Sequence, residues 1–308
     1  MPWELYAASL ANGRRETNLS HANDDLVSQV QLANVRRLSY KAKDGLALEA
    51  FVLYPEGYQR GRKYPLAINV HGGPHSAHPG ARSMVEYHAL AGKGYVVLLP
   101  NPRGSVGYGE AFTEACVRDW GGADYEDILR AVDVLVSRGV TDPQRVYIGG
   151  YSYGGFMASW AVGHTDRFRA AWVGAPVSNQ VSMFGTGDIP LLYMHETGGT
   201  PQDNLQTYIE RSPVTYLGNS NTPVLLVHHE GDLRCPIAQS EEIFHALKAM
   251  GKEVEFVRYP GGFHTYVTHA PSQTADRITR QIAWYESHKG VRRRTASRPK
   301  RARLTARR

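Results

Sequence analysis

The stretch RVYIGGYSYGGF, residues 145–156, constrains the fold of this chain more than any other part of the sequence. A short apolar run leads into the pentapeptide GYSYG, and the residues after it have the composition of a helix. In such a strand, sharp turn and helix, a GxSxG serine is held in a strained conformation that exposes its hydroxyl. Gly150 and Gly154 are expected because a Cβ at either position would collide with a neighbouring strand or helix. The stretch therefore predicts that Ser152 is a nucleophile, beside a helix N-terminus that favours negative charge.

From about residue 35 onward, strand-like runs alternate with helix-like segments, which is typical of a mostly parallel sheet with helices on both faces. Several runs, such as LAINV and YVVLL, are apolar throughout, as expected of strands buried on both sides. The fold class is α/β, and Ser152 follows the fifth of eight predicted strands. These strands are residues 37–41, 46–53, 66–70, 95–99, 145–148, 170–173, 224–228 and 254–258. Helices are predicted from apolar stripes at residues 124–136, 240–250 and 277–288.

Two regions depart from this alternation. Residues 174–216 carry large apolar side chains among glycines, and a long insertion of this kind is more often functional than decorative. We expect it to form one wall of a substrate pocket. Near the N-terminus, residues 4–10 resemble a strand followed by a turn at Asn12 and Gly13. Residues 14–31 are polar and weakly patterned, so that strand has no evident partner.

The pentapeptide alone has low specificity, and a nucleophilic serine also needs a base and an acid that orients the base. In the α/β-hydrolase arrangement these follow the serine in the order acid, then histidine, after later strands of the sheet. The predicted seventh strand is followed by Glu230-Gly231-Asp232, and the eighth by a glycine-rich loop that carries His264. We predict Asp232 as the acid and His264 as the base. Glu230 is the alternative acid, but a residue beyond Gly231 is better placed to reach across.

Hydrolysis through a serine also requires two donors for the oxyanion. One is expected to be the backbone N–H of Tyr153, which follows the nucleophile. The second should come from the loop after the third strand, which reads His71-Gly72-Gly73. Gly73 is the preferred donor and Gly72 the alternative.

The histidines do not indicate a metal site. Four of them have irregular spacings in a proline-containing loop and in the segment after it, and no acidic residue falls among the first three. These four are His71, His75, His78 and His88. Structural roles are predicted for His228, His229 and His269. Neither a metal nor a cofactor is expected.

A chain of 308 residues, 42% of them hydrophobic, is long enough for one large domain with a full core or for two small ones. No run approaches the roughly 18–20 consecutive apolar residues of a membrane helix. The N-terminus lacks the pattern of a signal peptide. Cys116 and Cys235 resemble neither a disulfide scaffold nor a metal knuckle. We therefore expect a cytoplasmic protein with reduced thiols and no membrane partner.

Positive charge is concentrated in residues 289–308, which contain ten Lys or Arg and no acidic residue. The net charge of +6 therefore belongs to this tail, and residues 1–288 alone are mildly acidic. The tail has no interleaved aromatic residues and no periodicity, which favours a disordered, non-specific segment. A nucleic-acid-binding protein that uses this tail, with steep salt dependence, is the alternative from another functional class.

Six motifs together carry a more specific signal than any one of them. They are HGGPHS (71–76), NPRGSVGYGEAF (101–112), DWGGADYEDI (119–128), GGYSYGGFM (149–157), GDLRCPIAQSEEIF (231–244) and GGFH (261–264). The chain thereby resembles, over roughly residues 35–288, the catalytic domain of the prolyl oligopeptidase family of serine peptidases. The resemblance is greatest to the acylaminoacyl-peptidase branch.

This resemblance implies an α/β-hydrolase fold and a catalytic triad of Ser152, Asp232 and His264, in agreement with the assignment from the residues. It implies a serine hydrolase that cleaves peptide, acyl-aminoacyl or ester bonds of a small substrate through an acyl-enzyme. Arg234 resembles the family arginine that binds a substrate carbonyl upstream of the scissile bond. His71 stands where proline-specific branches carry an oxyanion-binding tyrosine, which favours two backbone donors and argues against strict proline specificity.

Members of the family also carry an N-terminal β-propeller that screens substrates by size, which the sequence lacks. Residues 1–35 resemble the last strands of such a propeller, residues 36–288 the catalytic domain, and residues 289–308 form the basic tail. We expect either a truncated chain or a natural short form whose pocket is open to solvent. An open pocket makes a carboxylesterase acting on short acyl esters the alternative function. Apolar surface left uncovered favours homo-oligomers.

Overall fold

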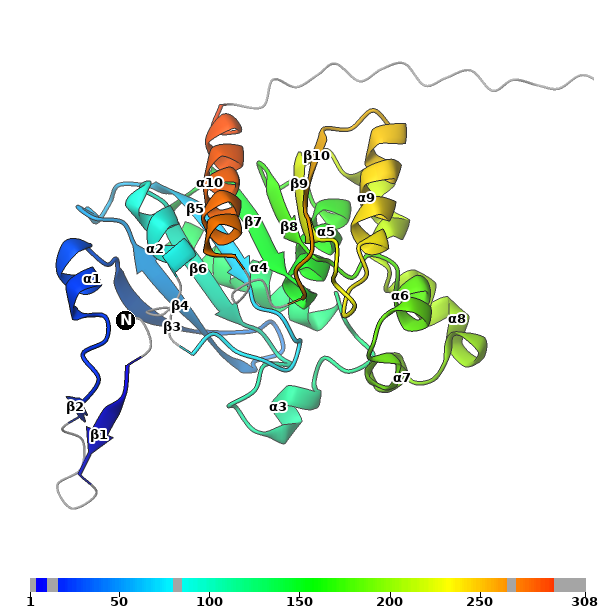
Figure 1. Cartoon of the computed structure of the whole chain (residues 1–308), viewed down its shortest axis with the longest axis horizontal. Coiled ribbons are helices and arrows are strands. Elements are labelled where there is room, and N and C mark those ends of the chain that lie inside the picture. The colour runs from blue at the N-terminus through cyan, green and yellow to red at the C-terminus, as the bar shows by residue number, and fades with distance from the viewer. Residues whose placement is uncertain (1–3, 10–15, 80–84, 265–269, 291–308) are drawn as a thin grey trace, which may run out of the picture.

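Eight strands form the central sheet of the computed structural model, which describes residues 4–9, 16–79, 85–264 and 270–290. Their order is β10-β9-β8-β7-β5-β6-β4-β3 (Figure 1). The β3–β4 and β4–β6 pairs are antiparallel, and the other neighbours are parallel. The eight predicted strands and the mostly parallel sheet are therefore confirmed. The strands are β3 Asn34–Lys41, β4 Ala47–Tyr54, β5 Tyr64–Val70, β6 Val96–Asn101, β7 Thr141–Tyr151, β8 Ala171–Gly174, β9 Val224–His229 and β10 Val254–Tyr259.

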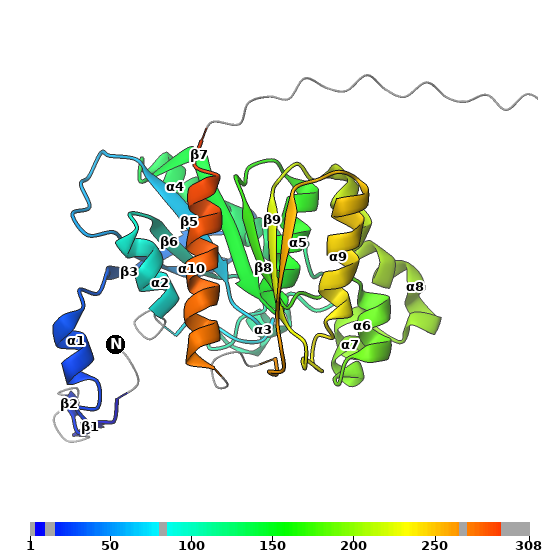
Figure 2. The same cartoon turned by 45° about the horizontal axis from the view of Figure 1, so that its top comes forward.

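Helices cover both faces of this sheet, as predicted (Figures 1 and 2). One core holds Ile128, Phe156 and Ile243 from α4, α5 and α9, and the core on the opposite face holds Leu90 and Tyr285 from α2 and α10. Strands β5, β6 and β9 are buried at every position, which accounts for their continuous apolar runs. The helices are α2 Val85–Gly92, α4 Ala123–Ser137, α5 Tyr153–His164, α9 Ala238–Ala249 and α10 Pro271–Ser287.

The three predicted helices correspond to α4, α9 and α10. The last of them begins earlier than predicted, at Pro271, because proline is well suited to the first turn of a helix. The apolar stripe used for the prediction reaches only the second half of α10.

The insertion after β8 folds into short helices that lie beside α9 (Figures 1 and 2). Two of them have capping side chains at their start: Asn179 accepts hydrogen bonds from the first turn of α6, and Thr200 forms a capping box with Asp203 in α8. The elements are α6 Gln180–Thr186, α7 Pro190–Thr197, α8 Pro201–Glu210 and a 3₁₀ helix Pro213–Asn219. A further short helix, α3 Glu110–Glu114, follows β6.

The N-terminal segment forms a small unit of its own, drawn in blue in Figure 1. Strand β1, Tyr6–Ala8, pairs antiparallel with β2, Glu16–Asn18, and α1, Asp24–Gln29, follows. The Glu4 carboxylate accepts hydrogen bonds from the backbone N–H groups of Ala22, at 3.0 Å, and Asn23, at 2.7 Å. The predicted N-terminal strand thus has a partner in β2, which the sequence did not reveal because that region is polar.

Some expectations concern residues outside the described ranges. The turn at Asn12 and Gly13, His269 and the tail beyond residue 290 all lie there. Within the described ranges, no helix combines the length and the apolar character needed to cross a membrane.

An ion pair joins α10 to α2 beneath the sheet. The Arg277 guanidinium lies 2.5 Å from the Glu86 carboxylate, and the two side chains are only 2% and 4% exposed. The guanidinium carbon also lies 5.2 Å from the centre of the Trp172 ring on β8. Because both charges are removed from water, each is stabilised mainly by the other.

Arg277→Leu removes the cation and leaves the Glu86 carboxylate buried. We expect the free energy of unfolding to fall by about 3–5 kcal/mol, measured by urea denaturation with tryptophan fluorescence. Arg280→Leu on the same helix breaks a pair with Asp276 that is half exposed, and should cost at most about 1 kcal/mol. Equal losses in the two variants would contradict the importance given to burial.

Candidate active site

Ser152 lies at the turn between β7 and α5 with φ 63° and ψ −122°. Residues other than glycine rarely adopt this left-handed backbone. The Ser152 N–H donates to the Gly174 carbonyl oxygen at 3.0 Å. A Cβ on Gly150 would lie 2.6 Å from the Val70 carbonyl oxygen, and one on Gly154 only 2.1 Å from it. The predicted requirement for both glycines is therefore confirmed.

His264 and Asp232 contact each other, with 2.7 Å between His264 Nδ1 and Asp232 Oδ2. The other carboxylate oxygen, Oδ1, accepts hydrogen bonds from the backbone N–H groups of Arg234 and Cys235, each at 2.9 Å. Burial acts to raise the pKa of Asp232, but hydrogen bonds from His228 and His264 outweigh it and hold the pKa well below its usual value. The ionised carboxylate favours a proton on Nδ1 of His264, which leaves Nε2 as the acceptor nitrogen.

Glu230, the alternative acid, has a different partner from Asp232. It is exposed at the end of β9 and pairs with Arg258 at 3.1 Å. The structure thus brings Asp232, and not Glu230, against His264.

His228 supports the acid from behind. Its ring is fully buried. Nε2 lies 2.8 Å from the Cys235 carbonyl oxygen and 3.3 Å from Asp232 Oδ2, and Nδ1 lies 2.8 Å from the Ser240 hydroxyl oxygen. Sequence reasoning predicts only a structural role for this histidine and misses its contact with the carboxylate. The available signal was its place in VHHEGD, four residues before Asp232. His229, also predicted to be structural, packs against the Tyr259 ring with centroids 5.3 Å apart.

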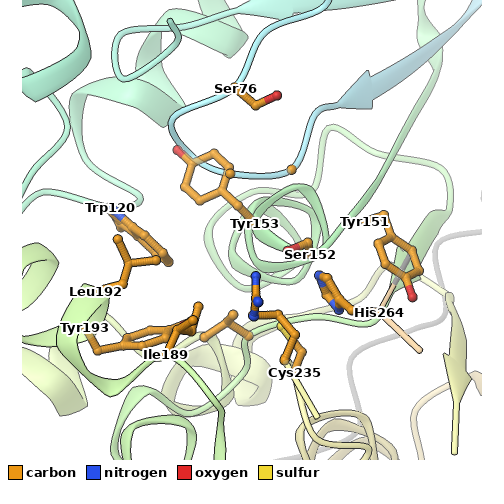
Figure 3. A pocket seen from close by; sticks show the side chains of 14 residues that line it. Ser76, Trp120, Tyr151, Ser152, Tyr153, Ile189, Leu192, Tyr193, Cys235 and His264 are labelled. Carbon is orange, nitrogen blue, oxygen red and sulfur yellow. The ribbon is translucent and has the colours of Figure 1, made fainter. Parts of the chain in front are cut away.

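Ser152 and His264 line the same pocket, of about 400 Å³. Figure 3 shows Ser152 with His264 on one side and an apolar wall on the other. The insertion contributes to that wall, as the sequence predicts, through Ile189, Leu192 and Tyr193. The other lining residues are Gly72, Gly73, Ser76, Trp120, Tyr151, Tyr153, Val177, Arg234 and Cys235.

Both glycines considered as oxyanion donors line this pocket. A Cβ on Gly72 would lie 3.4 Å from Ser152 Cβ, which places the backbone at Gly72 next to the serine. Gly73 adopts φ +123°, where a Cβ would meet the following backbone at 2.6 Å. Glycine is thus required at 73 by conformation, whereas a Cβ at 72 would make only ordinary van der Waals contact with Ser152.

Tyr153 is anchored through its side chain. Its phenol donates a hydrogen bond to Asp124, whose carboxylate also accepts backbone N–H groups of Gly121 at 3.2 Å and Tyr125 at 2.7 Å. Complete burial outweighs these hydrogen bonds and raises the pKa of Asp124 to about 7. Asp124 therefore fixes the side chain of the residue that follows Ser152 and lines the pocket, a role that sequence reasoning missed.

Arg234 stands at the pocket, where the sequence predicts a substrate-binding residue. Its Nε lies 2.5 Å from Asp188 Oδ1, and both side chains are 45% exposed. The ion pair orients the guanidinium without removing it from solvent.

His71, His75, His78 and His88 each have a different partner. His71 Nε2 lies 3.0 Å from the Ser105 hydroxyl oxygen, and His78 Nε2 lies 3.0 Å from a backbone carbonyl oxygen. Burial lowers the pKa of His71 to about 4 and that of His78 to about 3, so both are neutral at pH 7. His88 accepts a hydrogen bond from a backbone N–H, and His75 contacts Glu196.

The chain is similar to known peptidases in both sequence and structure. A model of the prolyl oligopeptidase family matches residues 82–292. An uncharacterized peptidase, YuxL, of Bacillus subtilis is 39% identical over 290 residues, which cover 93% of this chain and 44% of the relative. The acylamino-acid-releasing enzyme of Mus musculus is 34% identical over 257 residues, covering 80% and 34%.

Among solved structures, an acylaminoacyl peptidase of Pyrococcus horikoshii matches with a TM-score of 0.86 and 31% identity, over 92% of this chain and 46% of that one. An acylaminoacyl peptidase in complex with Z-Gly-Gly-Phe-chloromethyl ketone matches with a TM-score of 0.85 and 31% identity, over 92% and 45%. The chain spans less than half the length of these relatives. The α/β-hydrolase fold predicted from the sequence is confirmed, and the chain belongs to the prolyl oligopeptidase family.

Proposed function

We propose that this chain is a serine hydrolase of the acylaminoacyl-peptidase type, which cleaves acyl-aminoacyl and peptide bonds through an acyl-enzyme. The observation that carries the proposal is the 2.7 Å contact between His264 and Asp232, in the pocket that also exposes the strained Ser152. The relatives named as peptidases favour amide bonds over the ester alternative. Short activated esters remain useful as test substrates.

In this mechanism His264 Nε2 takes the proton from the Ser152 hydroxyl while Oγ forms a bond to the substrate carbonyl carbon. The backbone N–H groups of Tyr153 and Gly73 stabilise the negative oxygen of the tetrahedral intermediate. When the intermediate collapses, the scissile C–N bond breaks and His264 gives its proton to the leaving amine. Water then attacks the acyl-enzyme by the same route. Asp232 stays ionised and stabilises the charged ring of His264.

The pocket wall supports a preference for a large apolar residue on the acyl side of the scissile bond. Trp120 and Tyr193 present aromatic rings, and Val177 and Leu192 add aliphatic surface. The inhibitor bound to the related acylaminoacyl peptidase carries phenylalanine next to its reactive group. We extend that preference to this chain.

A cytoplasmic location is part of the proposal. Cys116 and Cys235 are unpaired and buried, and burial raises the pKa of both thiols well above the usual value. Neutral, buried thiols resist oxidation and suit a reducing compartment.

Ser152→Ala should lower turnover by about a millionfold, because the nucleophile is removed while binding is kept. The measurement is steady-state hydrolysis of N-acetyl-phenylalanine p-nitroanilide. Ser159→Ala is the matched control, since that hydroxyl donates to carbonyl groups inside α5 and lies outside the pocket. A Ser152 variant that kept more than about a thousandth of wild-type turnover would exclude this serine as nucleophile.

Leu192→Ala should lower kcat/KM for N-acetyl-phenylalanine p-nitroanilide by about tenfold, because it removes apolar contact from the acyl-side wall. The same rate constant for the N-acetyl-glycine substrate should change less than about twofold. Leu191→Ala is the control, because the Leu191 side chain, next to Leu192 in the chain, is 77% exposed and does not line the pocket. Equal effects on the two substrates would contradict the assignment of the wall.

Arg234→Ala should raise KM for an N-acetylated dipeptide p-nitroanilide by about tenfold, through loss of a charged hydrogen bond to the upstream carbonyl. p-Nitrophenyl acetate has no such carbonyl, so its KM should not change. Arg258→Ala, which removes another half-exposed arginine, serves as the control. An equal rise in KM with both substrates would indicate a structural effect instead.

A further inference from the structure

A single buried carboxylate connects three parts of the pocket. Glu196, on α7, is only 3% exposed. Its Oε1 lies 2.8 Å from His75 Nε2, and its Oε2 accepts a hydrogen bond from Trp120 Nε1 at 2.8 Å. His75 belongs to the loop that carries Gly73, Trp120 lines the pocket, and α7 itself carries Tyr193.

The contacts of His75 define its charge. Its Nδ1 lies 3.0 Å from the Gly104 carbonyl oxygen, and its Nε2 faces Glu196. The carbonyl oxygen can only accept hydrogen bonds, and so can Glu196 as a carboxylate. With Glu196 ionised, both ring nitrogens carry a proton and the ring is an imidazolium. Burial acts to lower the pKa of His75, but the bonds to Glu196 and Gly104 outweigh it and raise the pKa above the usual value.

The surroundings of His75 favour the same charge. The titratable groups that face it are Glu196 on α7, Glu114 on α3 and Cys116 in the turn after α3. His75, Cys116 and Glu196 bring candidate metal-ligand atoms within 4.8 Å of one another. However, both nitrogens of His75 already face acceptors, and both oxygens of Glu196 already face donors. These contacts describe a hydrogen-bonded ion pair, which a cation would have to break.

We propose that Glu196 is a positioning residue for catalysis: it holds the oxyanion loop in place through charged His75, and the acyl-side wall in place through Trp120. This inference rests on the function proposed for Ser152. It predicts that loss of the His75 contact and loss of the Trp120 contact change different kinetic constants. The link through His75 controls kcat, because the loop carries the oxyanion donor Gly73. The link through Trp120 controls KM, because that ring is part of the pocket wall proposed to bind the acyl side chain.

The His75 link also depends on pH. A histidine whose pKa is raised by folding keeps its interaction in full below the ordinary value of about 6.5. The interaction is lost as the pH rises through the raised pKa. His264 must be unprotonated to act as the base, so kcat rises with pH on the acid side. Deprotonation of His75 then produces a fall in kcat on the alkaline side.

The test compares pH profiles of kcat and KM for N-acetyl-phenylalanine p-nitroanilide in four variants of the full chain. Glu196→Gln should lower kcat at pH 8 by about ten- to a hundredfold, as expected when a reacting geometry is slightly misplaced. It should also move the alkaline limb of kcat toward lower pH by about one unit, because the carboxylate no longer favours the imidazolium. His75→Gln should give a reduced kcat without that alkaline limb.

The other two variants separate the links. Trp120→Phe keeps an aromatic ring but removes the N–H that donates to Glu196 together with part of the ring surface, so KM should rise while the alkaline limb of kcat stays in place. Glu126→Gln changes a half-exposed acid that pairs with Lys43 and is not among the groups that face His75, and should leave kcat within about twofold.

The proposal is overturned if Glu196→Gln leaves both kcat and the alkaline limb unchanged, or if the limb survives in His75→Gln. Should the Glu196 variant fail to fold, His75→Gln decides alone, because the His75 side chain is 23% exposed and its replacement leaves no buried charge at position 75. Activity that persists in Ser152→Ala would refute the proposed function instead, so the two failures are distinguishable.

Discussion

Helix α5 and strand β5 approach each other so closely that no side chain fits between them at residue 154, where a Cβ would lie 2.1 Å from the Val70 carbonyl oxygen. This contact places the start of α5 directly behind the loop that follows β5. As a result, the Tyr153 backbone, the Gly72–Gly73 turn and the Ser152 side chain all line one pocket. The strained backbone of Ser152 persists because the packing of β5, β7 and α5 leaves the turn no other conformation.

Most of the sheet could be predicted from the sequence, because a strand buried on both faces must be apolar along its whole length. The positions of Asp232 and His264 could also be predicted, since loops that follow parallel strands meet at one edge of the sheet. The short helices of the insertion were harder to predict from the sequence. Each is stabilised by a cap and by packing on a neighbour, and none has a long periodic apolar stripe. Likewise, the pairing of β1 with β2 involves exposed residues that leave no apolar pattern.

The roles of Glu196 and Asp124 could not have been predicted, because each depends on a partner far away in the sequence. His228 lies only four positions before Asp232, but the sequence does not show that its buried ring turns toward the carboxylate. Glu196 faces His75 across 121 positions, and Asp124 faces Tyr153 across 29. The buried acids Asp232 and Asp124 differ in their neighbours. Asp232 has two histidines and stays ionised, whereas Asp124 has a phenol and two backbone N–H groups, and its pKa rises to about 7. The same side-chain chemistry thus gives different charge states according to which partners the fold supplies.

The N-terminal unit has a consequence for how stability is distributed along the chain. Helix α1 buries none of its residues, and among the strands that the structure describes β1 and β2 pair only with each other. The hydrogen bonds of Glu4 close this unit on itself and add nothing to the sheet. It and the sheet therefore behave as separate cooperative units, and local opening of the first requires far less free energy than global unfolding. Loss of order in β1, β2 and α1 would leave Ser152, Asp232 and His264 where they are.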